Sequence, residues 1–468
     1  MQTRVCTHLT SRVRAIGWRG AGVTLLGLTD ASLLWWGGGA SAAQQLVAVL
    51  AGAAAGCLAL LWIALDRNFS RMPLWWVAGL ALVLRLVAVQ AAPLLEDDHY
   101  RYLWDGLRTA TAFDPYRLPP SAFFGADELT AQWQDVLSGI NHPVVPTIYG
   151  PVLQWLFALA HWVAPGKVGA IQAIVLLVDM ACLGLLAQQR VGMRGLLAYA
   201  LHPMILKEAM ASAHPDGLVA LLLLLAMVAW QRGLALRVGA LLGLAVATKV
   251  AALVVLPLFL FWLRPSHAPD AAVGIRLHAD RRSALSMGMG FVCSLCLMYL
   301  PFIAAGGNDV AALQTFATQW RFNPLLFRVI ETGLAAGTAR PAAAGLLLAC
   351  IAGLVWRWHR RGEPRTPGLP PVDLALLLLL LLAPVVNPWY WLWALAPALL
   401  VGRGLVAAVA GAGVLSYLNT SVLHEAGWLA AGSLAAPFSV GWPITLLQLA
   451  VLGSAWLAQR RLSRQGLF

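Results

Sequence analysis

A polar segment from Glu96 to Pro151 gathers side chains suited to chemistry in an otherwise apolar chain. It opens with E-D-D-H-Y-R-Y-L-W-D-G and closes with N-H-P-V-V-P-T-I-Y-G-P. Because an apolar run of helical length precedes it, Asp97 and Asp98 are expected at a membrane surface. Two neighbouring carboxylates favour acid–base chemistry there, since mutual repulsion makes one of a pair a better proton acceptor near neutral pH. The alternative is a hydrophilic loop without a chemical role.

The composition is that of a membrane protein. Of the 468 residues, 60% are hydrophobic and 11% are charged. The repeated apolar runs predict membrane-spanning helices, because backbone polar groups in lipid must be satisfied within the segment. The net charge of +12 arises from Lys and Arg in short loops between these runs, a pattern that orients membrane proteins and does not indicate nucleic-acid binding. We expect an all-α polytopic protein with a basic cytoplasmic tail, residues 1–19, and one transmembrane domain, residues 20–468.

The basic loops predict the orientation of about 12–14 crossing helices, with both termini in the cytoplasm. Two segments are then external, a large first loop over residues 96–151 and a second over 305–339. The basic loop 264–283 is cytoplasmic. The cysteines carry little information, because most lie in apolar runs where a free Cys acts as a small hydrophobe.

Three segments need a closer assignment. The run 151–164 is short for a crossing and is expected to be re-entrant or interfacial. Residues 195–213 are expected to form one helix, and residues 238–263 two short helices with Lys249 near their outer turn. Arg85 lies in mid-span, where a lone charge is costly, so a later helix should supply a partner such as Asp179.

Under this topology the unusual polar residues collect on the external side, where ionisable groups are functional candidates. Besides the two aspartates they are Arg101, Tyr102, Asp105, His142, Tyr149, His202, Glu208, His214, Asp216, Lys249, Arg321, Asn323, Asn387, Trp389 and Tyr390. Structural alternatives exist: Asp105 at i+4 from Arg101 suits a helix pair, Trp389 suits an interfacial belt, and Lys249 suits snorkelling. Their common side favours a shared substrate-binding site. We identify no dedicated metal cluster, although Asp97 and Asp98 could hold a divalent ion.

Several of these segments resemble GT-C glycosyltransferases, most closely bacterial mannosyltransferases that use polyprenyl-phosphate sugars. After the first loop, H-P-M-I-L-K-E-A-M-A-S-A-H-P-D-G, G-L-A-V-A-T-K, T-Q-W-R-F-N-P and N-P-W-Y-W-L-W follow in the family's order. The resemblance extends over about residues 73–402. The chain departs from the family's pattern at His202 and Pro215, where Asn is usual, and at Gly150, where a second Pro is frequent.

The resemblance implies a GT-C helical bundle that transfers a sugar, most often mannose, from polyprenyl phosphate to a hydroxyl of a lipid- or glycan-linked acceptor. It implies an inverting reaction in cell-envelope glycan synthesis, on the external face of the bacterial cytoplasmic membrane. The family's catalytic carboxylate matches Asp97, with Asp98 as the neighbouring candidate, and a carboxylate there acts as general base. Lys249, Arg321 or a histidine would stabilise the leaving phosphate. Glu208 is the other partner considered for Lys249.

A transporter or a lipid or glycan flippase is the alternative class, because it also places charged residues and broken helices within the bilayer. The sequence shows no inverted repeat, and its polar groups lie on one side, which favours an enzyme. A GT-C ligase that transfers a preassembled glycan is a third possibility.

Overall fold

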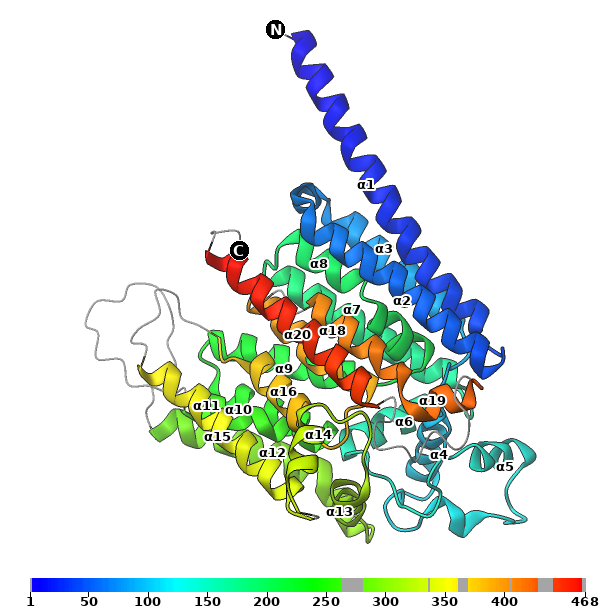
Figure 1. The fold of residues 1–468 in the computed structure, drawn as a ribbon. Coiled ribbons are helices and arrows are strands. Elements are labelled where there is room, and N and C mark those ends of the chain that lie inside the picture. Colours follow the sequence, from blue (N-terminus) through cyan, green and yellow to red (C-terminus); the bar gives the residue numbers. More distant parts are fainter. Residues whose placement is uncertain are drawn as a thin grey trace. The chain divides into compact units, whose positions relative to one another are not determined.

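The computed structural model describes residues 2–261, 281–335, 337–360, 369–403, 406–427 and 441–464 (Figure 1). Within these ranges the protein is helical, and its β structure is limited to one bridge between Phe322 and Val385. The expected all-α polytopic class is confirmed. Residues 264–280 of the expected basic loop lie outside the described residues.

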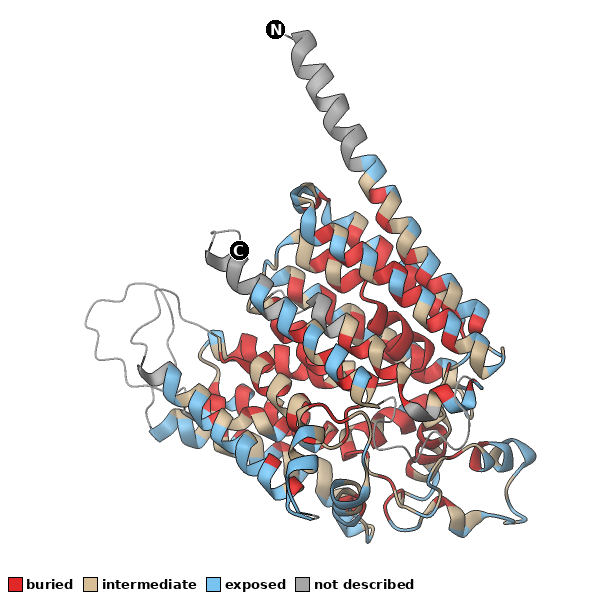
Figure 2. Ribbon diagram, in the orientation of Figure 1, coloured by how far each residue is buried: buried red, intermediate tan, exposed pale blue. Residues whose placement is uncertain are grey.

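Four helices in the described part of the chain are long and apolar enough to cross a membrane: α2 (Ala42–Leu65), α7 (Val168–Gln188), α12 (Arg281–Ala304) and α15 (Ala339–Arg360). Shorter apolar helices include α3 (Leu74–Ala88), α6 (Pro151–Val163), α9 (Gly217–Gln231), α10 (Ala235–Thr248) and α16 (Val372–Leu382). In α12 and α15 only 22% of the apolar window is buried inside the protein, as expected for helices that face lipid (Figure 2).

The chain divides into two compact units, each built from segments that are far apart in the sequence. The first unit comprises Met1–Glu96, Asp179–His214 and Gly402–Phe468. Beside α2 and α3 it contains α1 (Gln2–Gly37), η1 (Arg67–Arg71), α8 (Met193–Ala200), the π-helix η3 (Ile205–Ala211), α18 (Val406–Leu415), η6 (Ser416–Leu418), α19 (Thr420–Glu425) and α20 (Gly441–Arg464). Helix α1 packs on α2 and α3, and α18 packs on α20 and α2.

A buried ion pair joins α3 to α7 in this unit. Nε of Arg85 donates to Oδ2 of Asp179 at 2.5 Å, and the hydroxyl of Tyr199 donates to the other carboxylate oxygen at 2.7 Å. A second nitrogen of Arg85 donates to the carbonyl of Ala200, where α8 ends and backbone carbonyls lack helical partners. The expected partnership of Arg85 with Asp179 is therefore confirmed, and it also stabilises the end of a helix.

The expectation of one helix over residues 195–213 was wrong. Helix α8 ends at Ala200, and the chain resumes as the π-helix η3 at Ile205. Leu201 and His202 form the interruption, and Pro203 directly follows it, where its missing N–H and its ring prevent a continuous α-helix.

The second unit comprises Asp97–Val178 and Pro215–Val401. Its first polar loop contains α4 (Asp98–Thr111), η2 (Pro120–Phe123) and α5 (Ala131–Ser138). Later come η4 (Val250–Val255), α11 (Leu256–Phe261), α13 (Val310–Gln319), α14 (Leu326–Gly333), η5 (Pro388–Trp391) and α17 (Leu392–Leu400). Helix α10 stops at Thr248 because Lys249 takes an extended conformation (φ −144°, ψ 121°), so the chain breaks where the sequence led us to expect a turn.

The C-terminal end of α6 contacts the first polar loop of the second unit. Near its C-terminal end, the His161 ring lies 5.6 Å from the Trp133 ring of α5, measured between centroids. Just beyond, Nε2 of Gln132 donates to the carbonyl of Gly166 at 3.3 Å. The turn after α6 is therefore attached to the first polar loop. That α6 does not cross the membrane stays a prediction.

The start of α6 fits tightly against the end of α10. An added Cβ at Gly150 would lie 2.1 Å from the carbonyl oxygen of Ala247, far inside van der Waals contact. Glycine therefore lets the loop that carries Tyr149 approach the backbone beside Lys249.

Gly150→Ala should lower the free energy of unfolding by about 1–3 kcal/mol, because the new methyl group has to push two backbones apart. The matched control is Gly184→Ala in α7, where an added Cβ meets nothing within 4 Å. There alanine should be neutral or stabilising, since it is the better helix former. Thermal unfolding in detergent compares the two variants. Equal stability of both would contradict the tight approach.

Membrane topology can be tested at the turn after α6. Lys167 is exposed, and Lys167→Cys in a cysteine-free background should react with an impermeant thiol reagent in intact cells. Ser138→Cys in the first loop should behave in the same way, whereas Ser70→Cys and Gln231→Cys should react only after lysis. Labelling of Lys167→Cys only after lysis, with Ser138→Cys labelled in intact cells, would show that α6 crosses.

Candidate functional site

The two candidate carboxylates lie at the N-terminus of α4. Asp97 occupies the N-cap position and Asp98 the first turn, where the helix dipole stabilises negative charge. Asn141 joins them: its amide Nδ2 donates to Oδ1 of Asp97 at 2.5 Å and to Oδ1 of Asp98 at 3.2 Å. Sequence reasoning missed Asn141, although it stands in the motif that supplied His142. One amide thus fixes the spacing of both carboxylates.

Two tyrosines hold the other side of Asp98. The hydroxyl of Tyr149 donates to Oδ2 at 3.1 Å, and that of Tyr102 lies 3.5 Å from the same oxygen. The Tyr102 ring also stacks on Phe157 of α6. Burial, and then the nearby Asp98 carboxylate, raises the pKa of Tyr149 well above its ordinary value, so it remains a hydrogen-bond donor. Asp98 is therefore oriented by donors from two directions.

Lys249 is held by Asp216. Its Nζ lies 3.7 Å from Oδ1 of Asp216, and the indole Nε1 of Trp393 donates to the same oxygen at 2.7 Å. The ammonium also lies over the rings of Tyr149, at 4.8 Å, and Tyr390, at 5.5 Å. Burial raises the pKa of Asp216, while the charge of Lys249 opposes that shift. With a side chain only 12% exposed, Lys249 does not snorkel to the surface.

The carboxylate paired with Lys249 is thus Asp216, whereas Glu208 pairs with Lys207 and His214 in the first unit. The sequence placed Asp216 among the candidate residues but did not pair it with Lys249. Trp393 closes the N-P-W-Y-W-L-W motif but was not singled out as a candidate. Its neighbour Tyr390 stacks on it with ring centroids 4.4 Å apart, and both Tyr390 and Trp389 are buried.

Arg101 and Asp105 hold the first loop in shape. Arg101 donates to the carbonyl of Val145 at 2.7 Å, and Gln154 of α6 donates to Oδ2 of Asp105 at 3.2 Å. Burial raises the pKa of Asp105 to about 6, although the charge of Arg101 counteracts it. Arg101 and Asp105 thus interact through their charges, as the helix-pair alternative expects, and each also has a hydrogen-bond partner elsewhere in the unit.

The first polar loop touches the second through His142. The His142 ring lies 4.3 Å from that of Trp320, and its backbone has a positive φ of 48°. Next to Trp320, Phe322 exchanges backbone hydrogen bonds with Pro384 and Val386, so Asn323 lies beside the segment that ends in Asn387. Arg321 instead pairs with Glu331 at 2.6 Å, with a side chain 45% exposed. Arg321 therefore has a surface partner, unlike Lys249, which is mostly covered.

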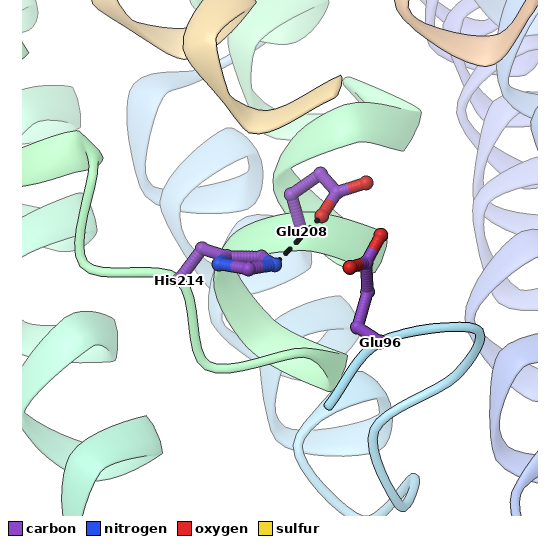
Figure 3. Close-up of side chains that lie close together, drawn as sticks. All are labelled: Glu96, Glu208 and His214. Atoms are coloured by element: carbon purple, nitrogen blue, oxygen red, sulfur yellow. Dashed lines mark ion pairs between the residues drawn. The ribbon is translucent and has the colours of Figure 1, made fainter. Parts of the chain in front are cut away.

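The first unit holds the remaining candidates. Glu208 in η3 and His214 just after it are fully buried, and Glu96 lies beside them (Figure 3). Each of the three offers one possible ligand atom, and these atoms lie within 4.8 Å of one another. His202 is buried at the start of η3, where its carbonyl accepts the amide of Ile205. Sequence reasoning found Glu208, His214 and His202 but did not single out Glu96 or Lys207.

Comparison with known proteins gives a consistent picture. A family model described as the alpha-(1->6)-mannopyranosyltransferase N-terminal domain matches residues 9–264. Alpha-(1->6)-mannopyranosyltransferase A of Mycobacterium tuberculosis (strain ATCC 25618 / H37Rv) is 24% identical over 409 residues, covering 78% of this chain and 73% of that protein. The matched region contains both aspartates, the broken helix at Pro203 and Lys249. Apolar helices, a carboxylate pair and this match agree that the chain belongs to the alpha-(1->6)-mannopyranosyltransferase family and is a membrane mannosyltransferase of GT-C type.

Proposed function

We propose that the protein transfers mannose from a polyprenyl-phosphate mannose donor to a hydroxyl of a lipid- or glycan-linked acceptor. The transfer inverts the anomeric carbon, takes place on the external face of the cytoplasmic membrane, and forms an α-(1→6) linkage like the one named for the relative. The observation that carries the proposal is the carboxylate pair at the start of α4, bridged by Asn141. In a mannosyltransferase, one carboxylate of this pair can act as the base that accepts the proton of the acceptor hydroxyl.

Asp97 is the proposed general base. Its carboxylate accepts the proton of the acceptor hydroxyl while that oxygen attacks the anomeric carbon on the face opposite the phosphate. Asp98, which accepts hydrogen bonds from Asn141 and Tyr149, keeps its place beside Asp97. Holding the base in a fixed geometry is worth several kcal/mol, because the orientation no longer has to be reached by chance.

Lys249 is the proposed contact of the donor phosphate. A buried ammonium is costly without an anion nearby, and Asp216 supplies one in the free protein. A phosphate beside Lys249 would meet a cation already positioned by Asp216, with the rings of Tyr149 and Tyr390 on its flanks. As the glycosidic bond breaks, negative charge grows on the leaving phosphate, and a preorganised cation stabilises it.

The external location rests on charge and on contacts. Basic residues fall in the loops assigned to the cytoplasm, and the polar segment with Asp97 falls on the opposite side. The bond between Gln132 and Gly166 keeps the turn after α6 with that polar segment. A lipid-linked donor reaches such a site from the membrane surface.

Asp97→Asn should lower mannose transfer by about a hundredfold or more, because the amide cannot take the acceptor proton. The matched control is Asp127→Asn, an exposed carboxylate of the same loop, which should keep near-normal turnover. The assay is transfer of labelled mannose from polyprenyl-phosphate mannose by purified protein. Normal turnover of Asp97→Asn with an inactive Asp98→Asn would assign the base to Asp98. Normal turnover of both would refute the carboxylate mechanism.

Lys249 and Asp216 allow the roles in stability and in donor binding to be separated. Lys249→Met alone should lower the free energy of unfolding by about 3 kcal/mol, because it leaves a buried carboxylate uncompensated. Lys249→Met with Asp216→Asn should regain most of that stability. The double variant should still bind the donor at least about tenfold more weakly, since the phosphate has lost a charged partner. Donor affinity equal to that of the unaltered protein in the stable double variant would exclude Lys249 as the phosphate contact.

A further inference from the structure

A cluster of four charged or ionisable side chains lies in the first unit. Nζ of Lys207 is 3.5 Å from Oε1 of Glu96 and 3.3 Å from Oε1 of Glu208. Nε2 of His214 is 3.4 Å from the other oxygen of Glu208. The side chains of Glu208 and His214 are fully buried, and that of Lys207 is 4% exposed. Two carboxylates therefore share one ammonium where water hardly reaches.

The backbone fixes the same residues. The carbonyl of Lys207 accepts the amide of Ser212 at 2.9 Å, and the carbonyl of Glu208 accepts the amide of His214 at 2.9 Å. The first bond joins residues five apart, as in the π-helix η3, a conformation found mostly where a helix serves a functional site. The second joins Glu208 to the stretch that follows η3. As a result, Lys207 and Glu208 are held next to the stretch that carries His214.

Without Lys207, the remaining three side chains would suit a divalent cation. Glu96, Glu208 and His214 each present one ligand atom within 4.8 Å of the others, and carboxylate with imidazole is a common ligand set for transition metals (Figure 3). Lys207 changes this, because its ammonium already lies against both carboxylates. A metal ion added there would face a like charge at short range in a poorly solvated place.

The ammonium of Lys207 is also covered by an aromatic ring. Its Nζ lies 4.4 Å from the centroid of Tyr417, in the geometry of a cation–π contact. Two carboxylates and a ring face are thus arranged around one positive charge. This arrangement suits a bound cation, and the ammonium of Lys207 takes that position.

We propose that Lys207 is the built-in cation of a Glu–Glu–His site, in the place that a divalent ion would take, and that it positions the chain leading to the catalytic base. Glu96, which it holds, immediately precedes Asp97 in the sequence. His214, linked to it through Glu208, stands two residues before Asp216. Lys207 is therefore a positioning residue. This second part rests on the proposed role of Asp97, whereas the first part does not.

The first test uses the full-length protein and Mn²⁺ alone. Lys207→Ala should bind one Mn²⁺, seen as loss of the free-ion signal in electron paramagnetic resonance, because the ammonium that occupies the space between the two carboxylates is removed. The unaltered protein and Lys167→Ala, a surface lysine control, should bind none at this site. Adding His214→Ala to Lys207→Ala should abolish the binding. Mn²⁺ binding by the unaltered protein that Glu208→Gln removes would overturn the proposal, and so would a folded Lys207→Ala that binds no Mn²⁺.

A second measurement guards against misfolding of the single variant. Lys207→Ala should lower the melting temperature, and Lys207→Ala with Glu208→Gln should recover much of the loss, because one buried negative charge is then removed. A double variant no more stable than the single one would contradict the charge pairing. Neither measurement uses mannose transfer, so both stand even if the proposed function fails.

The positioning role has its own readout. Lys207→Ala should lower the rate of mannose transfer by about a hundredfold, as misplacement of a catalytic group does. Added Mn²⁺ should restore at least about a tenth of the lost rate, with no effect on Lys167→Ala. A merely structural lysine would give no such rescue. Full activity of Lys207→Ala, in an assay where Asp97→Asn is inactive, would refute the positioning role while leaving the proposed function intact.

Discussion

A positive charge inside a membrane protein must be met by an anion or by oriented dipoles, because little water is present to solvate it. Three buried or largely buried cations of this mannosyltransferase obey that constraint in three ways. Arg85 meets a carboxylate and the carbonyls at the end of α8, Lys207 meets two carboxylates and a ring, and Lys249 meets one carboxylate between two rings. Each arrangement lies at a helix end or at an interruption. In this protein the paired cations are thus found where helices end or are interrupted.

The interruptions also determine what the protein can present to a substrate. A continuous helix uses its backbone polar groups internally, whereas a broken one leaves amides and carbonyls to be satisfied by side chains. Helix α8 ends just before His202 and Pro203, and α10 ends at Lys249, so a polar side chain stands at each break. In a soluble enzyme, loops supply such positions, but within apolar surroundings they require breaks of this kind. For this reason, polar residues of the family motifs lie where helices α8 and α10 end.

The sequence predicted those features that follow from general limits on a chain in lipid. The helical class follows from the need to satisfy backbone polar groups, and the pairing of Arg85 with Asp179 from the cost of a lone charge. The break at Lys249 follows from the length of its apolar run between two basic loops. The resemblance located the carboxylates of the first loop. Contacts between distant segments could not be predicted, because a local sequence pattern does not indicate which loops pack against each other. For this reason Asn141, Trp393 and the pairing of Lys249 with Asp216 were missed. The single helix over 195–213 was a different error: apolar periodicity was weighted above Pro203.

The wide turns of η3 make the cation cluster sensitive to chain length. A π-helix contains one residue more per hydrogen-bonded ring than an α-helix, and removing one residue restores the α-helical repeat. Each residue of an α-helix advances about 100° around the axis, so such a deletion would rotate everything before it by roughly that angle relative to His214. Lys207 and Glu208 would then point elsewhere, and the pairing with His214 would be lost. The number of residues in Ile205–Ala211, as much as their side chains, thus determines where Lys207 and Glu208 lie relative to His214.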